Sequence, residues 1–147
     1  MFFTRNTKIA SHYYDSLISE AKRSDFESAI MEKVQENEMS EVFTYEDFIV
    51  SFKQNEDIVI CLIGSLKTNE LIFEALLDTI SAAMNLVYKI PDSNSVIQQI
   101  EYLYFIIDET IDQGFVFEGD PNVVASRVLL KGDNSFTGKG ISYVSKF

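Results

Sequence analysis

The segment from Phe48 to Ile63 constrains the fold more than any other part of the chain. From 48 to 53, Phe48, Val50 and Phe52 alternate with the residues between them, which predicts a half-buried strand. After a polar turn at 54–57, residues 58–63 are apolar on both faces and rich in β-branched side chains, as in a central strand covered on both sides. The sequence therefore predicts a hairpin at the middle of an antiparallel sheet.

Weaker patterns surround this hairpin. Helical periodicity and capping residues predict the later helices, with Asn69 opening one, Gly114 ending the next and Asp120-Pro121 beginning the last. The predicted elements outside the hairpin are strands at about 8–14 and 42–45 and helices at about 18–36, 70–87, 94–113 and 121–130. This order is typical of an α+β fold with helices flanking an antiparallel sheet. We expect one domain over 1–131 and a flexible tail over 132–147.

Charge and composition exclude several classes of function. Twelve basic and 23 acidic residues give a net charge of −11, so the chain has no general electrostatic reason to bind nucleic acid or anionic lipid. Cys61 is the only cysteine, which excludes an internal disulfide and a cysteine-based zinc site. We see no signal peptide and no uncharged run near the ~20 residues that cross a bilayer, so we expect a cytoplasmic protein.

Three groups of residues could carry chemistry, and each has a simpler interpretation. The acidic residues near 110 could bind Mg²⁺ or Ca²⁺ or form a carboxylate pair, but EF-hand spacing is not met and no oxyanion motif accompanies them, so we favour a solvated helix face plus a helix cap. His12 lies in a predicted strand, and Gly138-Lys139-Gly140 lacks the phosphate-binding loop pattern. We expect no catalytic, cofactor-binding or metal-binding residue. The acidic group comprises Asp108, Glu109, Asp112, Glu118 and Asp120.

The third predicted helix is apolar over much of its circumference. Tyr102, Phe105 and Ile106 form a stripe beside a first stripe that runs from Ile97 to Ile111. Such a helix is buried on two sides, one of which can take the sheet. The other side packs either on the second helix of the same chain or on another protein. We take these three residues as a candidate partner interface, partly exposed in the isolated chain.

Three motifs in the last third of the chain resemble the coatomer zeta subunit family: D-E-x-x-D-x-G at 108–114, E-x-D-P at 118–121 and R-V-x-L-K-G at 127–132. Further similarity lies at 8–15, at the 63–71 junction and at 137–144. The Asn69-Glu70-Leu71 junction is shared with the sigma subunits of clathrin adaptors. The residues that match the family signature are Asp108, Glu109, Asp112, Gly114, Glu118, Asp120, Pro121, Arg127 and Gly132.

The resemblance implies a longin-like fold with a five-stranded antiparallel sheet between helices. It implies a non-catalytic small subunit of the coatomer (COPI) coat, held by the solenoid of the large gamma subunit and recruited by the GTPase Arf. The expected process is retrograde Golgi-to-ER and intra-Golgi transport, with the protein peripheral on Golgi membranes and vesicles. One alternative is a sigma-type adaptor subunit that recognises dileucine signals. Another is a metal-dependent enzyme using Asp108, Asp112 and Asp120.

The chain departs from the family pattern in two places. The family has an apolar first strand in mid-sheet before the counterpart of Lys8, whereas here only Met1, Phe2 and Phe3 stand for it. We therefore expect a first strand that is largely missing, and weak folding of the isolated chain unless upstream residues are encoded. The tail ends at Phe147 without the amphipathic extension usual in the family, so a contact carried by the tail is not expected.

Overall fold

The computed structural model describes residues 1–5, 7–15, 17–37 and 41–136, with the side chains of 134–136 excepted. The chain forms two compact units, Met1–Leu77 and Asp78–Phe147. The boundary between them falls inside helix α2 (Glu70–Tyr88), which belongs to both units. The single domain expected over 1–131 therefore stays a prediction.

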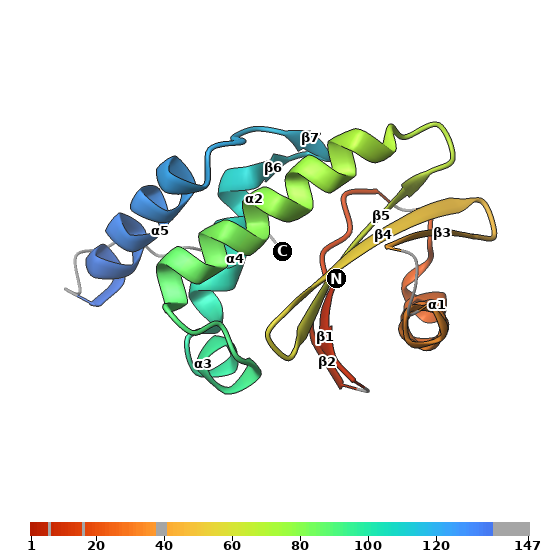
Figure 1. Cartoon of the computed structure of the whole chain (residues 1–147), viewed down its shortest axis with the longest axis horizontal. Helices are drawn as coiled ribbons and strands as arrows, with labels where there is room; N and C mark the ends of the chain where they lie inside the picture. The colour runs from red at the N-terminus through yellow and green to blue at the C-terminus, as the bar shows by residue number, and fades with distance from the viewer. Residues whose placement is uncertain (6, 16, 38–40, 137–147) are drawn as a thin grey trace. The chain divides into compact units, whose positions relative to one another are not determined.

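The first unit contains a five-stranded antiparallel sheet in the order β2-β1-β5-β4-β3 (Figure 1). The predicted hairpin is confirmed, because β4 and β5 pair along their whole length and the chain reverses at Glu56-Asp57. β5 lies between β1 and β4, as the doubly apolar pattern requires. The expected α+β fold class with a five-stranded antiparallel sheet is confirmed. The strands are β1 (Phe2–Thr4), β2 (Thr7–Ala10), β3 (Val42–Tyr45), β4 (Phe48–Asn55) and β5 (Ile58–Ser65).

The first strand is short but present. β1 pairs with β2 on one side and with β5 on the other, and both Phe2 and Phe3 are buried. Pairing extends to the first residue, since the Cys61 N–H donates to the Met1 carbonyl oxygen at 2.8 Å. The expectation of weak folding stays a prediction, and a cooperative melt at high temperature would contradict it.

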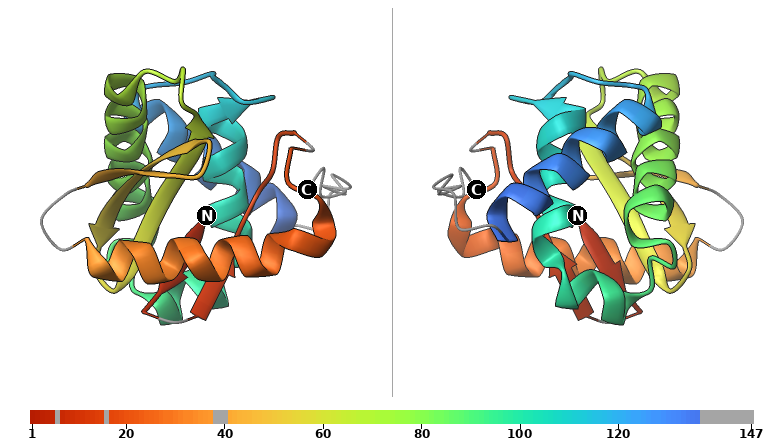
Figure 2. Two further views of the ribbon diagram at one scale, coloured as in Figure 1. Left: turned by 90° about the vertical axis from the view of Figure 1, so that its right-hand side faces the viewer. Right: turned by 90° about the vertical axis from the view of Figure 1, so that its left-hand side faces the viewer.

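Helix α1 (Glu20–Glu36) lies across one face of this sheet (Figure 2). Its apolar side chains repeat every four residues, so they share one face of the helix and meet the strands together. Burial raises the pKa of the Cys61 thiol to about 12, which keeps this side chain a neutral member of the core. The buried cluster consists of Phe26, Ile30 and Val34 from α1 with Phe3, Val50 and Cys61 from the sheet.

The predicted strand at 8–14 is wrong in its second half, because β2 ends at Ala10. The residues that follow turn toward Glu27 of α1 instead of continuing the ladder. Glu27 is buried, and its carboxylate accepts hydrogen bonds from Lys8 Nζ at 2.8 Å and Tyr13 Oη at 2.7 Å. Burial alone would raise the pKa of the Glu27 carboxyl, but hydrogen bonds from Lys8, Tyr13 and Ser11 outweigh it and hold that pKa below its ordinary value of 4.5.

This network predicts a pH dependence of stability. Because the pKa of Glu27 is lower in the folded chain than in the unfolded chain, its ionisation stabilises the fold above the ordinary value of 4.5. That contribution is lost as the pH falls through the lowered pKa, when the native carboxylate must accept a proton. We expect Glu27→Gln to have a lower free energy of unfolding than the unaltered chain at pH 7, measured by urea titration. The difference between the two free energies should shrink below pH 4.5. A difference in the free energy of unfolding that does not change with pH would contradict this role of Glu27.

The second unit differs from the single helix predicted at 94–113. Gln99 has φ −125° and ψ 49°, which are not helical angles, so the helix is interrupted there. The helix ends again at Thr110, and the chain then forms a two-stranded hairpin. The final helix is longer than the predicted 121–130 and continues to Phe136, and the flexible tail expected over 132–147 stays a prediction. The remainder, 137–147, lies outside the described residues. The elements are α3 (Ser93–Gln98), α4 (Ile100–Thr110), β6 (Ile111–Asp112), β7 (Phe115–Val116) and α5 (Pro121–Phe136).

Helix α2 begins where Asn69 predicted, since Asn69 Oδ1 accepts the Leu71 N–H at 2.9 Å. By length and composition alone, α2 could cross a membrane. In the structure, 44% of its most apolar stretch is buried. Glu74 and Asp78 within it would also be costly in hydrocarbon.

Candidate functional site in the signature segment

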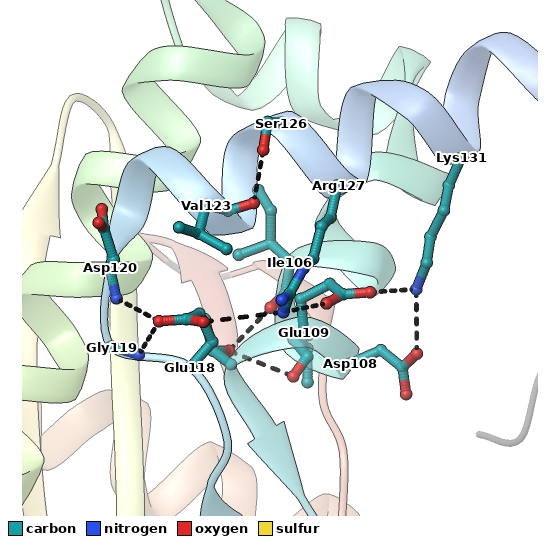
Figure 3. A network of polar contacts seen from close by, with 12 residues as sticks. Ile106, Asp108, Glu109, Glu118, Gly119, Asp120, Val123, Ser126, Arg127 and Lys131 are labelled. Carbon is teal, nitrogen blue, oxygen red and sulfur yellow. Dashed lines mark hydrogen bonds and ion pairs between the residues drawn. The ribbon is translucent and has the colours of Figure 1, made fainter.

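The nine signature residues lie on one continuous part of the second unit. The segment runs from the end of α4 through the β6–β7 hairpin and a short loop into α5, which packs along α4 (Figures 2 and 3). The structure thus brings the three sequence motifs together around the junction of the two helices.

Glu109 is the centre of this junction. It is buried, and its Oε1 lies 2.6 Å from Lys131 Nζ while its Oε2 lies 3.4 Å from Arg127 Nη1 (Figure 3). Arg127 Nη1 also lies 3.7 Å from Glu118 Oε2, and Lys131 Nζ lies 3.5 Å from Asp108 Oδ2. The expected solvated acidic face is therefore right for the exposed Asp108 and wrong for Glu109. Two cations from α5 compensate the buried carboxylate and tie α5 to α4.

The loop before α5 is held by its own carboxylates. Glu118 Oε1 accepts the N–H groups of Gly119 and Asp120, both at 3.0 Å. Asp120 Oδ1 accepts the Asn122 N–H at 2.9 Å, and Pro121 is the first helical residue. The predicted helix start at Asp120-Pro121 is confirmed. These bonds satisfy N–H groups that have no helical partner in the first turn.

Gly132 allows α5 to approach α4 closely. A Cβ added at Gly132 would lie 2.8 Å from Tyr102 Oη and 2.9 Å from Tyr102 Cζ. Moving the half-buried Tyr102 ring aside would disturb its edge-on contact with Tyr88, whose ring centroid lies 6.0 Å away. The last residue of the R-V-x-L-K-G motif is thus explained by helix packing.

We expect Gly132→Ala to be destabilising. Alanine would gain about 0.5–1 kcal/mol of helix propensity. Overpacking against Tyr102 costs about 1–3 kcal/mol, so the net effect is a loss of up to about 2.5 kcal/mol in the free energy of unfolding, measured by urea denaturation. Gly119→Ala is the matched control, because its Cβ would meet nothing within 4 Å. Removing the ring in Tyr102→Ala should make Gly132→Ala harmless, and persistence of the loss would contradict the steric explanation.

The acidic residues do not assemble into a metal site in the described part of the chain. Within residues 1–136 as described, no group of three or more His, Cys, Asp or Glu side chains is placed to hold a metal ion. Of the three residues of the enzyme hypothesis, Asp108 pairs with Lys131, Asp120 caps α5, and Asp112 is exposed on β6. The three carboxylates lie in different surroundings, so among the described residues they do not come together as the metal ligands that the enzyme hypothesis needs.

The candidate partner interface requires a correction. Ile106 is 0% exposed and Phe105 is 8% exposed, while Tyr102 is half-buried. Their expected exposure is therefore wrong for Phe105 and Ile106. The chain's own packing covers this stripe, and Lys131 Nζ of α5 lies 5.7 Å from the centroid of the Phe105 ring. A partner could reach only Tyr102 of these three without rearrangement.

Several strongly exposed apolar side chains of the signature segment lie elsewhere, on and just after the hairpin. Phe115 is 78% exposed and Phe117 61%, with Val116 exposed between them. Helical periodicity up to Ile111 and the interpretation of Gly114 as a helix cap concealed this hairpin. The overlooked signal was a glycine at the second position of a possible two-residue turn, followed by the apolar residues Phe115 to Phe117, although Gln-Gly is a weaker turn pair than Asn-Gly or Asp-Gly. Gln113 and Gly114 indeed have φ of 48° and 84°.

Comparisons with known proteins agree with these features. The sequence profile of the clathrin adaptor complex small chain family matches residues 1–135. The chain is 33% identical over 108 residues to coatomer subunit zeta of Saccharomyces cerevisiae, covering 73% of this chain and 57% of that relative. It is 29% identical over 126 residues to coatomer subunit zeta-1 of Homo sapiens, covering 85% of this chain and 71% of the relative.

Comparison of structures gives the same fold. A chain of a homology model of the full-length AP-3 complex in a stretched open conformation superposes with a TM-score of 0.70. The match covers 92% of this chain and 94% of the other at 16% identity, so it shows the fold alone. It agrees with the five-stranded antiparallel sheet and with the family profile that spans almost the whole chain. The chain belongs to the clathrin adaptor complex small chain family.

Proposed function

We propose that this protein is a non-catalytic small subunit of a COPI-type vesicle coat. The observation that carries the proposal is the similarity to coatomer zeta subunits over 73% of the chain for the yeast relative and 85% for the human one. The signature residues lie within the second unit, where they join α4, the hairpin and α5. Such a chain acts by binding its neighbours in a coat.

The proposed partner is a large gamma-type coat subunit, through which the chain joins the rest of the coat. Recruitment by an Arf GTPase would then be indirect, and the chain would be peripheral on Golgi membranes and transport vesicles. The proposed process is retrograde Golgi-to-ER and intra-Golgi transport. The chain spans 57% of the length of the yeast relative, so these properties of a whole zeta subunit are carried over as proposals.

Co-purification from cytosol of the source organism tests this function. The full chain with an affinity tag should recover a gamma-type subunit together with other coatomer subunits, identified by mass spectrometry at comparable amounts. Recovery of clathrin adaptor large subunits instead would favour the sigma-type alternative, which the family profile and the shared fold support more distantly than the coatomer zeta relatives support the first proposal. In that case a dileucine peptide should also bind in a calorimetric titration, whereas we expect no binding.

A further inference from the structure

The β6–β7 hairpin presents two phenylalanine rings to solvent, Phe115 from β7 and Phe117 from the position just after it. Ile111 pairs with Val116 and Asp112 with Phe115, and the Phe117 N–H continues the pairing by donating to the Thr110 carbonyl oxygen at 2.9 Å. Successive residues of an extended strand point to opposite sides, so Phe115 and Phe117 share one side at a spacing of about 7 Å. The two rings, 78% and 61% exposed, therefore form an apolar patch on one side of the hairpin, of the kind that marks a binding surface.

This hairpin tip, defined as Phe115, Val116 and Phe117, is presented by an anchored loop. On one side it continues directly from α4, and on the other Glu118 binds both the loop N–H groups and Arg127 of α5. Both turn residues, Gln113 and Gly114, have the positive φ of a tight two-residue turn. A loop fixed in this way loses little conformational entropy on binding, so it is preorganised for a partner.

The negative charge near the hairpin tip indicates which kind of surface could bind it. The segment 111–120 contains no Lys, Arg or His, and its exposed Asp112 lies beside the tip in a chain of net charge −11, whereas Glu118 is paired with Arg127 and Asp120 caps α5. Anionic lipid surfaces and a second copy of this acidic chain are therefore electrostatically unfavourable partners. A protein surface with an apolar pocket bordered by basic residues is complementary to both features of the tip.

We infer that the hairpin tip docks into an apolar pocket bordered by Lys or Arg on the large subunit of the coat. This inference rests on the proposed function and names the element of this chain that makes the contact. Phe115 and Phe117 are the anchors that fill the pocket, and Asp112, opposite Phe115 in the pairing, faces the basic border. Exposed aromatic anchors that become fully desolvated carry most of the binding energy in typical interfaces.

The test measures binding of the full chain to the purified gamma-type large subunit of the same coat. Phe115→Ser/Phe117→Ser should weaken binding about 100-fold or more, because two anchors are removed. Ile97→Ser/Leu130→Ser is the matched control, since it removes two other exposed apolar side chains of the same unit and should change binding by less than about threefold. Asp112→Lys should weaken binding about 3–10-fold and reduce its salt dependence. Thermal melts of all variants should match that of the unaltered chain.

The outcomes separate this inference from the proposed function. If the unaltered chain binds the large subunit and the double phenylalanine variant binds equally well, the inference is wrong while the function stands. If the unaltered chain does not bind, both are wrong. Sedimentation with phosphatidylserine vesicles that depends on Phe115 and Phe117 would overturn the inference in favour of a membrane. A dimer of the unaltered chain that the double variant abolishes, seen in analytical ultracentrifugation, would overturn it in favour of a second copy.

Discussion

Replacing Phe3 by alanine is expected to lower the free energy of unfolding by about 3–5 kcal/mol. Phe3 is 1% exposed, lies on the three-residue strand β1 between β2 and β5, and belongs to the cluster beneath α1. The strand is too short for neighbouring side chains to refill the cavity. Since a domain has only about 5–15 kcal/mol of stability in total, the variant should be largely unfolded or should melt at a much lower temperature.

Phe115→Ala is the matched control for this experiment. It makes the same chemical change at a side chain that is 78% exposed, so we expect the free energy of unfolding to change by less than about 0.5 kcal/mol. Both values come from urea titrations followed by circular dichroism. Equal losses for the two variants would contradict the central position of β1.

Removing both cations that face Glu109 should have the second large effect. In Arg127→Met/Lys131→Met the Glu109 carboxylate stays buried without a compensating charge. Breaking a buried ion pair from one side costs about 3–5 kcal/mol, and the remaining exposure of Glu109 reduces this to about 2–4 kcal/mol in the free energy of unfolding. Urea denaturation followed by circular dichroism measures the loss.

Two further variants test the explanation. Lys33→Met removes the cation of an exposed pair with Glu36, whose atoms are 3.5 Å apart, and should cost less than about 0.5 kcal/mol. Adding Glu109→Leu to the double variant should recover most of the lost stability, because an apolar group no longer needs a counter-charge. If the triple variant is as unstable as the double variant, lost packing of the long side chains rather than the stranded charge is responsible.

Most of the sheet could be predicted from local patterns. The alternation at 48–53 and the apolar run at 58–63 specify which faces are buried, and two residues of turn suffice to pair them. The helix starts at Asn69 and Asp120-Pro121 were predictable because a capping side chain acts within three residues of its own position. Strand β1 has only three residues, as expected of a largely missing first strand, but its pairing with β5 nearly 60 positions away follows from no local pattern.

The surroundings of the signature residues could not be predicted from the sequence. The motifs defined these nine residues, whose role in binding stays a prediction, and did not show that Glu109 is buried while Asp108 beside it is exposed. The apolar stripe of α4 predicted a helix covered on two sides. A partner protein was expected to cover residues that the chain itself buries. The exposed hairpin was missed because Gly114 suits both a helix end and a tight turn.

The sequence by itself determined the fold class, the family and the local starts and turns, because periodicity, capping and motif spacing act over a few residues. Only the tertiary structure decided which charges are buried and paired, why Gly132 must lack a side chain, and which apolar residues remain exposed. The physical reason is that burial depends on segments brought together from distant positions. Tyr102 and Gly132, thirty residues apart in the chain, meet only when α5 lies along α4.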